Sequence, residues 1–363
     1  MKMLIDSGCE VHAAASNAEG RMKEIEDIGI KCWEISFDRS PFSIKNLPAY
    51  YELKKVLKNN HYDLIHMHTP VASIVGRCAA AITKQQRPVI IYTAHGFHFF
   101  KGGSIKNWLF YPIERTFARL TDVLITINEE DFLLAQQFKT RHNKVFKLNG
   151  MGVDLRQFET NDSVLRQKVR RMLNISDQAK VIITVAEVND NKNQLQVIQS
   201  LPYLIQEDPN ILYLIVGNGA SEDKLKRITQ ELRLSGCVHF LGFRRDIPKL
   251  LLAADVFVLT SKREGLGLAA VEAMAAGLPL VMTNTVGGRT LIRPGINGWL
   301  VPRDDPQATA TAIREILNNT DGAKQMAKIN REVALNYSLA YVKHHLFEVY
   351  DEFLGLRGTT KMF

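Results

Sequence analysis

Short apolar segments alternate with helix-forming ones along the whole sequence, and this alternation limits the possible fold more than any other feature. In the first part of the chain, the apolar segments that we expect to be strands are 9–15, 31–37, 63–68, 88–93 and 123–128. Helix-forming segments separate them. Strands that are apolar throughout and alternate with helices are typical of a parallel sheet covered on both faces. The sequence therefore predicts an α/β protein.

A second series of the same kind begins at Val181, after a polar connector over residues 155–178. With 363 residues the chain is long for one core and sufficient for two. We expect an N-terminal domain over 1–155 and a second domain over 156–335. Residues 336–363 hold a final helix, about Leu339 to Phe353.

The central unit of the second series runs from residue 255 to 279. An apolar strand, Asp255 to Thr260, leads into a glycine-containing loop and then into a helix, Leu268 to Ala276, which ends at Gly277 and Pro279. The first turn of such a helix has free N–H groups and carries the positive end of the helix dipole. This helix start is therefore suited to binding a phosphate.

Two carboxylates lie at this helix start, Glu264 in the loop and Glu272 eight residues later. Phosphate oxygens repel carboxylates, so a ligand with both an anionic part and a hydroxyl-rich part fits better. Both glutamates can accept hydrogen bonds from sugar hydroxyls. The alternative is an amphipathic helix with ordinary solvated glutamates, but the surrounding motif favours the ligand.

The segment SKREGLGLAAVEAMAAGLPLV resembles the donor-site motif of retaining, nucleotide-sugar-dependent glycosyltransferases of family 4. The paired glutamates of that family fall on Glu264 and Glu272. The resemblance implies the GT-B fold, in which two Rossmann-like α/β domains face each other across a cleft and the last helix crosses back to the first domain. It also implies transfer without a metal ion, because cationic side chains and a helix dipole stabilise the diphosphate.

The resemblance also assigns residues that hold the donor. Lys192 follows strand 181–186 at a position where relatives have a basic residue for the diphosphate, although Glu187 stands where many relatives have an additional arginine. Arg244 and Arg245 resemble the segment that approaches the base and ribose, and surface charge explains them equally well. The donor-binding residues that we expect are Lys192, Arg244, Gly217, Gly265, Leu266, Gly267, Leu268 and Glu272.

His95 directly follows a strand and matches the family's histidine near the reacting sugar, so the expected catalytic residues are Glu264 and His95. We expect the side chains of His66 and His68, on strand 63–68, to lie on opposite faces of the sheet. They are therefore poorly placed to bind one metal ion together. Asn128 is sufficiently explained by helix capping or a turn.

The segments TAHGFHFFKG and TINEED most resemble capsular and exopolysaccharide members of the family. They imply a hexosyltransferase that uses a UDP-sugar and a saccharide acceptor, with a lipid-linked acceptor favoured. We expect Phe97, Phe99, Phe100 and Lys101 to form an aromatic and basic lip for the acceptor. An anionic membrane is then a candidate partner, at the inner face of the cell membrane.

The beginning of the chain departs from the family pattern. Relatives start with a strand and a loop, whereas here residues 1–8 read as the end of a helix that stops at Gly8. The sequence is thus expected to be truncated at its N-terminus, with an impaired first domain.

Composition and charge give no specific support to several other classes. Forty-six Lys and Arg against 38 Asp and Glu give a net charge of +8, but no nucleic-acid motif accompanies it. No apolar run approaches the roughly 20 residues of a membrane helix, and no secretory signal is evident. Four scattered cysteines fit buried thiols in a cytoplasmic protein, and no metal site is expected. Asp304 and Asp305 lie in a proline-flanked loop unlike a metal–diphosphate motif.

Three other functions remain open from the sequence. The first is an inactive truncated glycosyltransferase or binding subunit, and the second is a UDP-sugar epimerase, which shares the architecture. A dinucleotide-dependent oxidoreductase is disfavoured, because no GxGxxG follows a first strand.

Overall fold

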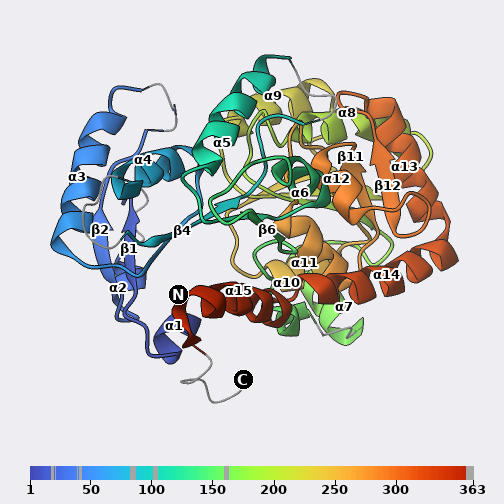
Figure 1. Cartoon of the computed structure of the whole chain (residues 1–363). Coiled ribbons are helices and arrows are strands. Elements are labelled where there is room, and N and C mark those ends of the chain that lie inside the picture. The colour runs from blue at the N-terminus through green and yellow to red at the C-terminus, as the bar shows by residue number, and fades with distance from the viewer. Residues whose placement is uncertain are drawn as a thin grey trace. The chain divides into compact units, whose positions relative to one another are not determined.

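The computed structural model describes residues 1–17, 20, 22–38, 40, 43–81, 87–100, 105–158 and 163–356. Contacts divide the chain into two compact units. Unit 1 comprises Met1–Leu148 together with Lys343–Phe363, and unit 2 comprises Asn149–Val342. Figure 1 shows strands in each unit with helices packed beside them.

Unit 2 contains a six-stranded sheet in the order β12-β11-β10-β7-β8-β9, in which every neighbouring pair is parallel. Its strands are β7 (Lys180–Val185), β8 (Ile211–Val216), β9 (Val238–Gly242), β10 (Val256–Leu259), β11 (Leu280–Thr283) and β12 (Gly298–Val301). β8, β10 and β11 are buried along their whole length, as expected for strands covered on both faces. The predicted strands of this unit are confirmed to within one or two residues.

The helices of unit 2 precede, separate and follow its strands. They are α7 (Ser163–Met172), α8 (Gln194–Ile205), α9 (Glu222–Glu231), α10 (Ile247–Ala253), α11 (Leu268–Ala276), α12 (Val286–Leu291), α13 (Pro306–Asn318) and α14 (Thr320–Ala334), with 3₁₀ turns η2 (Leu155–Phe158) and η3 (Leu335–Tyr337). The sequence reading missed α12 and α14. Two consecutive glycines in α12 disfavour a helix, and Thr285 offsets part of this cost by capping its start.

The described strands of unit 1 form two separate parallel sheets, β1-β2 and β3-β4-β5-β6. The strands are β1 (His12–Ala15), β2 (Lys31–Glu34), β3 (Leu64–Met67), β4 (Val89–Ala94), β5 (Val123–Thr126) and β6 (Lys144–Lys147). The helices are α1 (Lys2–Asp6), α2 (Met22–Glu26), α3 (Asn46–Asn59), α4 (Pro70–Ala81), η1 (Ile105–Leu109), α5 (Phe110–Ala118) and α6 (Glu129–Ala135). The alternation of strands and helices predicted for this part is confirmed.

The last helix, α15 (Leu339–Leu354), begins in unit 2, and from Lys343 onward its residues belong to unit 1. Val349 and Tyr350 are buried in one apolar cluster with Ile91 of β4 and Val123 of β5. The second half of α15 is therefore part of the core of unit 1.

Among the described residues, none of the helices has both the length and the apolar character needed to span a membrane. The four cysteines are free and half-buried, not buried as the sequence reading expected.

Candidate functional site

The loops that follow β7 and β10 are joined by hydrogen bonds at the carboxyl edge of the unit 2 sheet. These two strands are neighbours, so segments about 70 residues apart meet at this edge. The Asn191 side chain donates to the carbonyl of Arg263 over 3.1 Å, and the Lys262 N–H donates to the carbonyl of Asn191 over 2.7 Å. The sequence reading did not identify Asn191, although it lies directly before Lys192.

This junction brings two of the predicted residues into one ion pair. Lys192 Nζ lies 2.5 Å from Glu264 Oε2, and the Ser261 hydroxyl donates to the same oxygen over 3.2 Å. Both side chains are partly buried but keep some contact with solvent. The sequence reading placed Lys192 at the phosphate and Glu264 at the sugar, whereas in this structure the two groups neutralise each other.

The backbone of residues 265–268 leads into α11 in the way that the sequence predicted. Gly267 precedes the helix with a φ of 87°, a left-handed conformation that favours glycine. No side chain caps the start of the helix, so the first N–H groups depend on other partners. The N–H of Gly287, at the start of α12, donates to the carbonyl of Glu264 over 2.8 Å and fixes this loop.

Glu272 lies on α11 and is half-buried. Its carboxylate forms no hydrogen bond or ion pair within the described part of the chain, and burial raises its pKa. A partly desolvated carboxylate without a protein partner is a good candidate for accepting hydrogen bonds from a ligand.

Close packing explains why positions 217 and 219, which follow β8, are glycine. A Cβ on Gly217 would lie 2.0 Å from the carbonyl oxygen of Ala186, and a Cβ on Gly219 would lie 2.2 Å from that of Val188. Close packing against the loop after β7 therefore requires glycine at both positions. Their identity gives no separate support for the predicted donor contact of Gly217.

Arg244 follows β9, the edge strand of the sheet, and is held by a neighbour. Its guanidinium donates to both carboxylate oxygens of Asp246, over 2.8 and 2.7 Å. This hydrogen bonding lowers the pKa of Asp246 below its ordinary value. The structure thus pairs Arg244 with Asp246, and no hydrogen bond connects it to Lys192 or Glu264.

In unit 1, three histidines gather where β3 and β4 end. The rings of His66 and His68 have centroids 4.1 Å apart, and His68 Nδ1 lies 3.3 Å from His95 Nε2. The prediction that His66 and His68 face opposite sides of the sheet is wrong. The prediction fails because residues two positions apart along an extended chain point to the same face of a sheet.

The half-buried His66 forms the base of this histidine cluster. Its Nδ1 lies 2.5 Å from the Tyr350 hydroxyl of α15, and its Nε2 lies 2.7 Å from the Thr93 hydroxyl. His68 and His95 are exposed. The cluster thus offers two accessible imidazoles on a fixed support.

The environment keeps these imidazoles neutral. Partial desolvation by the surrounding protein, followed by the repulsion of His95 and the N-terminal amine, lowers the pKa of the His68 ring to about 4, although this side chain remains exposed. Burial lowers the pKa of His66 well below its ordinary value, and partial desolvation also lowers that of His95. Near neutral pH the cluster therefore carries no charge and can both donate and accept hydrogen bonds.

The loop after His95 is fixed to the start of α6. Asp131 Oδ2 accepts hydrogen bonds from the Phe97 N–H over 3.1 Å and from the Asn128 side chain over 2.8 Å. Asn128 caps α6 by accepting from the Asp131 N–H over 2.8 Å, as the sequence predicted. Burial raises the pKa of Asp131 to about 6.

The prediction that Phe97, Phe99 and Phe100 form an aromatic lip for the acceptor is wrong. Phe97, Phe99 and Phe100 are buried, and the first two rings stack with centroids 4.9 Å apart. They pack in the core because the loop turns inward after His95. Lys101 lies outside the described residues.

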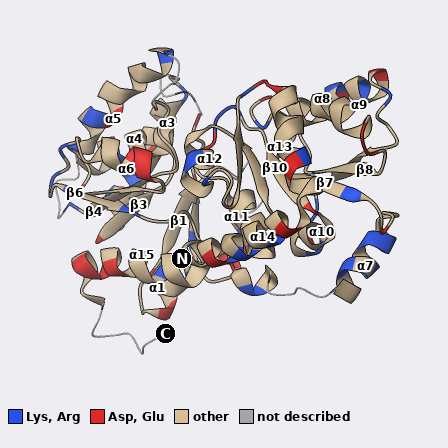
Figure 2. Cartoon of the chain, turned by 90° about the vertical axis from the view of Figure 1, so that its right-hand side faces the viewer, with Lys and Arg blue, Asp and Glu red and all other residues tan. Residues whose placement is uncertain are grey.

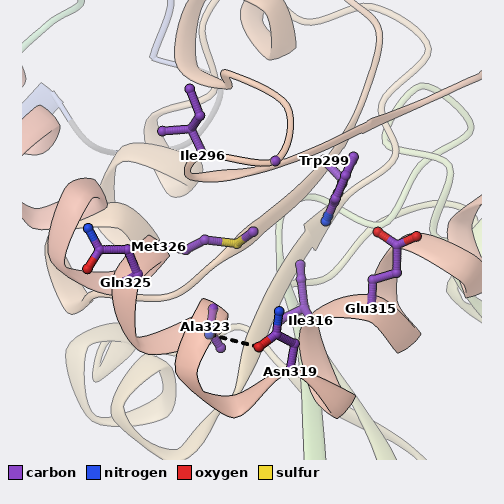
Figure 3. Close-up of a pocket in the computed structure, with 10 residues that line it drawn as sticks. Ile296, Trp299, Glu315, Ile316, Asn319, Ala323, Gln325 and Met326 are labelled. Carbon is purple, nitrogen blue, oxygen red and sulfur yellow. Dashed lines mark hydrogen bonds between the residues drawn. The ribbon is translucent and has the colours of Figure 1, made fainter.

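Unit 2 also has a pocket of about 390 Å³ that is separate from this site. Figure 3 shows Trp299, Ile316 and Met326 around it, with the Glu315 carboxylate near Trp299. It lies where β12 begins and α13 ends, whereas Lys192 and Glu264 follow the ends of parallel strands. The pocket is therefore at the opposite edge of the sheet from the ion pair.

Two family models match the chain. Residues 166–333 match "Glycosyl transferases group 1", and residues 1–128 match "Glycosyl transferase 4-like". The first match includes Lys192, Glu264 and Glu272, and the second includes the three histidines.

Similar proteins extend over most of the chain. A putative glycosyltransferase, EpsD of Bacillus subtilis, is 35% identical over 350 residues, which cover 96% of this chain and 91% of that protein. The UDP-Gal:alpha-D-GlcNAc-diphosphoundecaprenol alpha-1,3-galactosyltransferase of Escherichia coli is 31% identical, covering 76% of this chain and 72% of that protein. The structure of Anabaena HepE with UDP-glucose has a TM-score of 0.78 at 23% identity, covering 94% of this chain and 91% of that one.

Proposed function

We propose that this chain, which belongs to the group 1 family of glycosyl transferases and has the GT-B fold, transfers a sugar from a UDP-sugar to a saccharide acceptor in surface polysaccharide synthesis. The proposal includes retention of the anomeric configuration and a reaction that needs no metal ion. The observation that carries it is the Lys192–Glu264 ion pair beside the uncapped start of α11.

Lys192 and the start of α11 hold the diphosphate. When the donor binds, a phosphate oxygen replaces Glu264 as the partner of Lys192 Nζ, and the N–H groups of residues 265–268 donate to the same diphosphate. The leaving group gains negative charge as the bond between C1 and the β-phosphate oxygen breaks. A fixed ammonium group and a helix start stabilise that charge without a metal ion.

The two glutamates then contact hydroxyl groups. Release from Lys192 leaves Glu264 free to accept from the sugar near its reacting carbon, and Glu272 accepts from the ribose or the sugar. The acceptor oxygen bonds to C1 on the face from which UDP departs, and its proton passes to the departing phosphate oxygen. No covalent intermediate with the protein is required.

Unit 1 supplies the acceptor side, with His95 as its catalytic residue. His68 acts as a positioning residue, because its Nδ1 lies 3.3 Å from His95 Nε2 and its ring contacts that of His66, with centroids 4.1 Å apart. Such a contact favours one tautomer and one ring orientation of His95. A neutral His95 can then hydrogen-bond a hydroxyl group of the acceptor or of the transferred sugar.

The chemistry of the relatives supports a UDP-sugar and a lipid-linked acceptor. HepE binds UDP-glucose, and the name of the E. coli relative specifies UDP-Gal and a diphosphoundecaprenol acceptor. We place the reaction in the cytoplasm at the inner face of the membrane, where such acceptors present their saccharide.

A donor screen followed by product analysis tests this function. Thermal shift over a set of UDP- and GDP-sugars should show stabilisation by UDP-sugars, because a ligand that binds only the native state raises the melting temperature. The preferred donor is then incubated with an undecaprenyl-diphosphate-linked sugar, with and without EDTA, and NMR identifies the anomer formed. Transfer with retention in EDTA supports the proposal, whereas interconversion of free UDP-sugars without an acceptor favours an epimerase.

A further inference from the structure

Large apolar side chains are exposed on η1, the 3₁₀ turn between β4 and α5. Ile105 is 88% exposed, Leu109 is 70% exposed and Trp108 is 40% exposed. Together with Lys106 they form what we call the η1 surface. Three such side chains within five residues are unfavourable in water unless another surface covers them.

The η1 surface is fixed to the core from below. The Trp108 ring has its centroid 5.9 Å from that of the buried Phe99 and 5.9 Å from that of Tyr111. His98 and Phe110 pack beside them, with ring centroids 4.8 Å apart. One side of η1 is thus anchored by aromatic contacts, while Ile105 and Leu109 remain available on the outside.

Within the segment that contains η1 and α5, the exposed charged side chains have one sign. Between residues 105 and 120 the exposed charged side chains are Lys106, Arg115 and Arg119, and Figure 2 marks basic positions along α5. The one acidic residue of this segment, Glu114, is buried with its Oε2 3.4 Å from Arg77 Nη2. Aliphatic side chains, a tryptophan and cations without an exposed acid fit an anionic lipid interface.

The surface also lies on the functional side of unit 1. β4 and β5 are parallel, so the segment that connects them leaves the sheet at the edge where His95 lies. The contact between Trp108 and Phe99 then holds η1 near that edge, since Phe99 is only four residues from His95. A bilayer at η1 would present the saccharide of a lipid-linked acceptor on the side of the histidine cluster.

We propose that the η1 surface docks this enzyme on an anionic bilayer. The inference rests on the proposed lipid-linked acceptor. It assigns the membrane contact to Ile105, Trp108 and Leu109 and not to Phe99 and Phe100, which are buried. The aliphatic side chains insert at the boundary between headgroups and acyl chains, and the cations attract anionic headgroups.

Vesicle flotation of the full chain, without substrates, tests the docking surface. Vesicles contain either phosphatidylcholine alone or phosphatidylcholine with phosphatidylglycerol. The wild type should float with the anionic vesicles, and added salt should reduce this fraction. The double substitution Ile105→Ser with Leu109→Ser should lower partitioning about tenfold or more, because two large apolar groups no longer leave water.

A matched double variant tests whether any exposed apolar pair would have this effect. Val164→Ser with Met172→Ser removes two side chains of α7 that are 71% and 74% exposed and lie among basic residues, and flotation should stay within twofold. Equal flotation of the η1 variant and the wild type would overturn the inference, as would a wild type that does not float. If the wild type does not float but forms a dimer that the η1 variant loses, the η1 surface instead binds a second copy of the chain.

Donor binding separates this inference from the proposed function. If the wild type binds UDP but does not float, the docking surface is refuted and the donor site stands. If it floats through η1 but transfers no sugar from any nucleotide donor, the docking surface stands and the proposed function fails.

Discussion

The two units place polar side chains at the carboxyl ends of parallel strands, but the chemistry differs. Unit 2 presents an ion pair, Lys192 with Glu264, next to a helix start. Unit 1 presents the cluster His66, His68 and His95, whose lowered pKa values keep it uncharged near neutral pH.

This difference matches the two halves of a glycosyl transfer. A departing diphosphate requires positive charge that is fixed before the reaction, whereas an attacking alcohol requires neutral groups that orient a hydroxyl. Permanent charge in unit 1 would repel or trap charged parts of the ligands, and neutral groups in unit 2 would leave the diphosphate uncompensated. Substitutions that remove a charged group in unit 2 should therefore reduce activity more than substitutions of the neutral histidines in unit 1.

The largest effect is expected from Glu264→Gln. The turnover number should fall about 100-fold, because the carboxylate that we propose to contact the sugar near its reacting carbon is lost. Affinity for UDP should stay within about threefold or increase, because Lys192 no longer has a competing partner. Steady-state kinetics and calorimetry measure the two quantities, and Glu222→Gln, at a surface ion pair with Lys226, serves as the control.

Glu272→Gln should have the opposite pattern to Glu264→Gln, because it should weaken donor binding more than it slows turnover. The dissociation constant of the UDP-sugar should rise about tenfold, with a turnover number within threefold of wild type, since we propose that the partly buried carboxylate contacts a part of the donor that does not react. If Glu264→Gln and Glu272→Gln have similar small effects, the roles assigned to the two glutamates are wrong.

A moderate effect in unit 1 is expected from His68→Asn. Turnover should fall about five- to tenfold without a change in UDP affinity, because His95 loses the contact that fixes its ring. NMR of the His95 ring nitrogens should show a mixture of tautomers in the variant and one tautomer in the wild type. His61→Asn, at an exposed histidine 3.7 Å from Asp63, should change neither property.

The smallest effect is the dependence of stability on pH. His68 has a pKa of about 4 when folded, against an ordinary value of 6.5, so the unfolded chain binds a proton first as the pH falls. Stability is therefore lost as the pH falls from about 6.5 toward 4. Asp131, with a raised pKa of about 6, acts in the opposite direction. His68→Asn should thus lose less stability than wild type over this interval in urea titrations.

Much of the fold could be predicted because apolar periodicity marks buried strands directly. β10 and α11 were placed well, since an apolar run followed by a glycine loop and an alanine-rich helix has few alternatives. α14 was missed as a whole because it is largely polar and begins, after the Asn319 cap, with Thr320, Asp321 and Gly322. The burial of Phe99 could not be read from its neighbours, since only the tertiary path of the loop turns it inward.

The candidate site was predictable in part for a similar reason. Glu264, Glu272, Lys192 and His95 belong to motifs that can be read locally. The ion pair between Lys192 and Glu264 joins residues 72 positions apart, and the contact between His68 and His95 joins residues 27 positions apart. Such contacts follow from strand order, which a single sequence does not specify.

The proposed function depends most on one property: Lys192 and the start of α11 hold a diphosphate without a metal ion. Titration calorimetry with UDP in EDTA, on the wild type and on Lys192→Gln, measures this directly. Binding by the wild type in EDTA, with affinity at least about tenfold lower in Lys192→Gln, is the predicted result. Loss of wild-type binding in EDTA, or equal affinities of the two proteins, would contradict it.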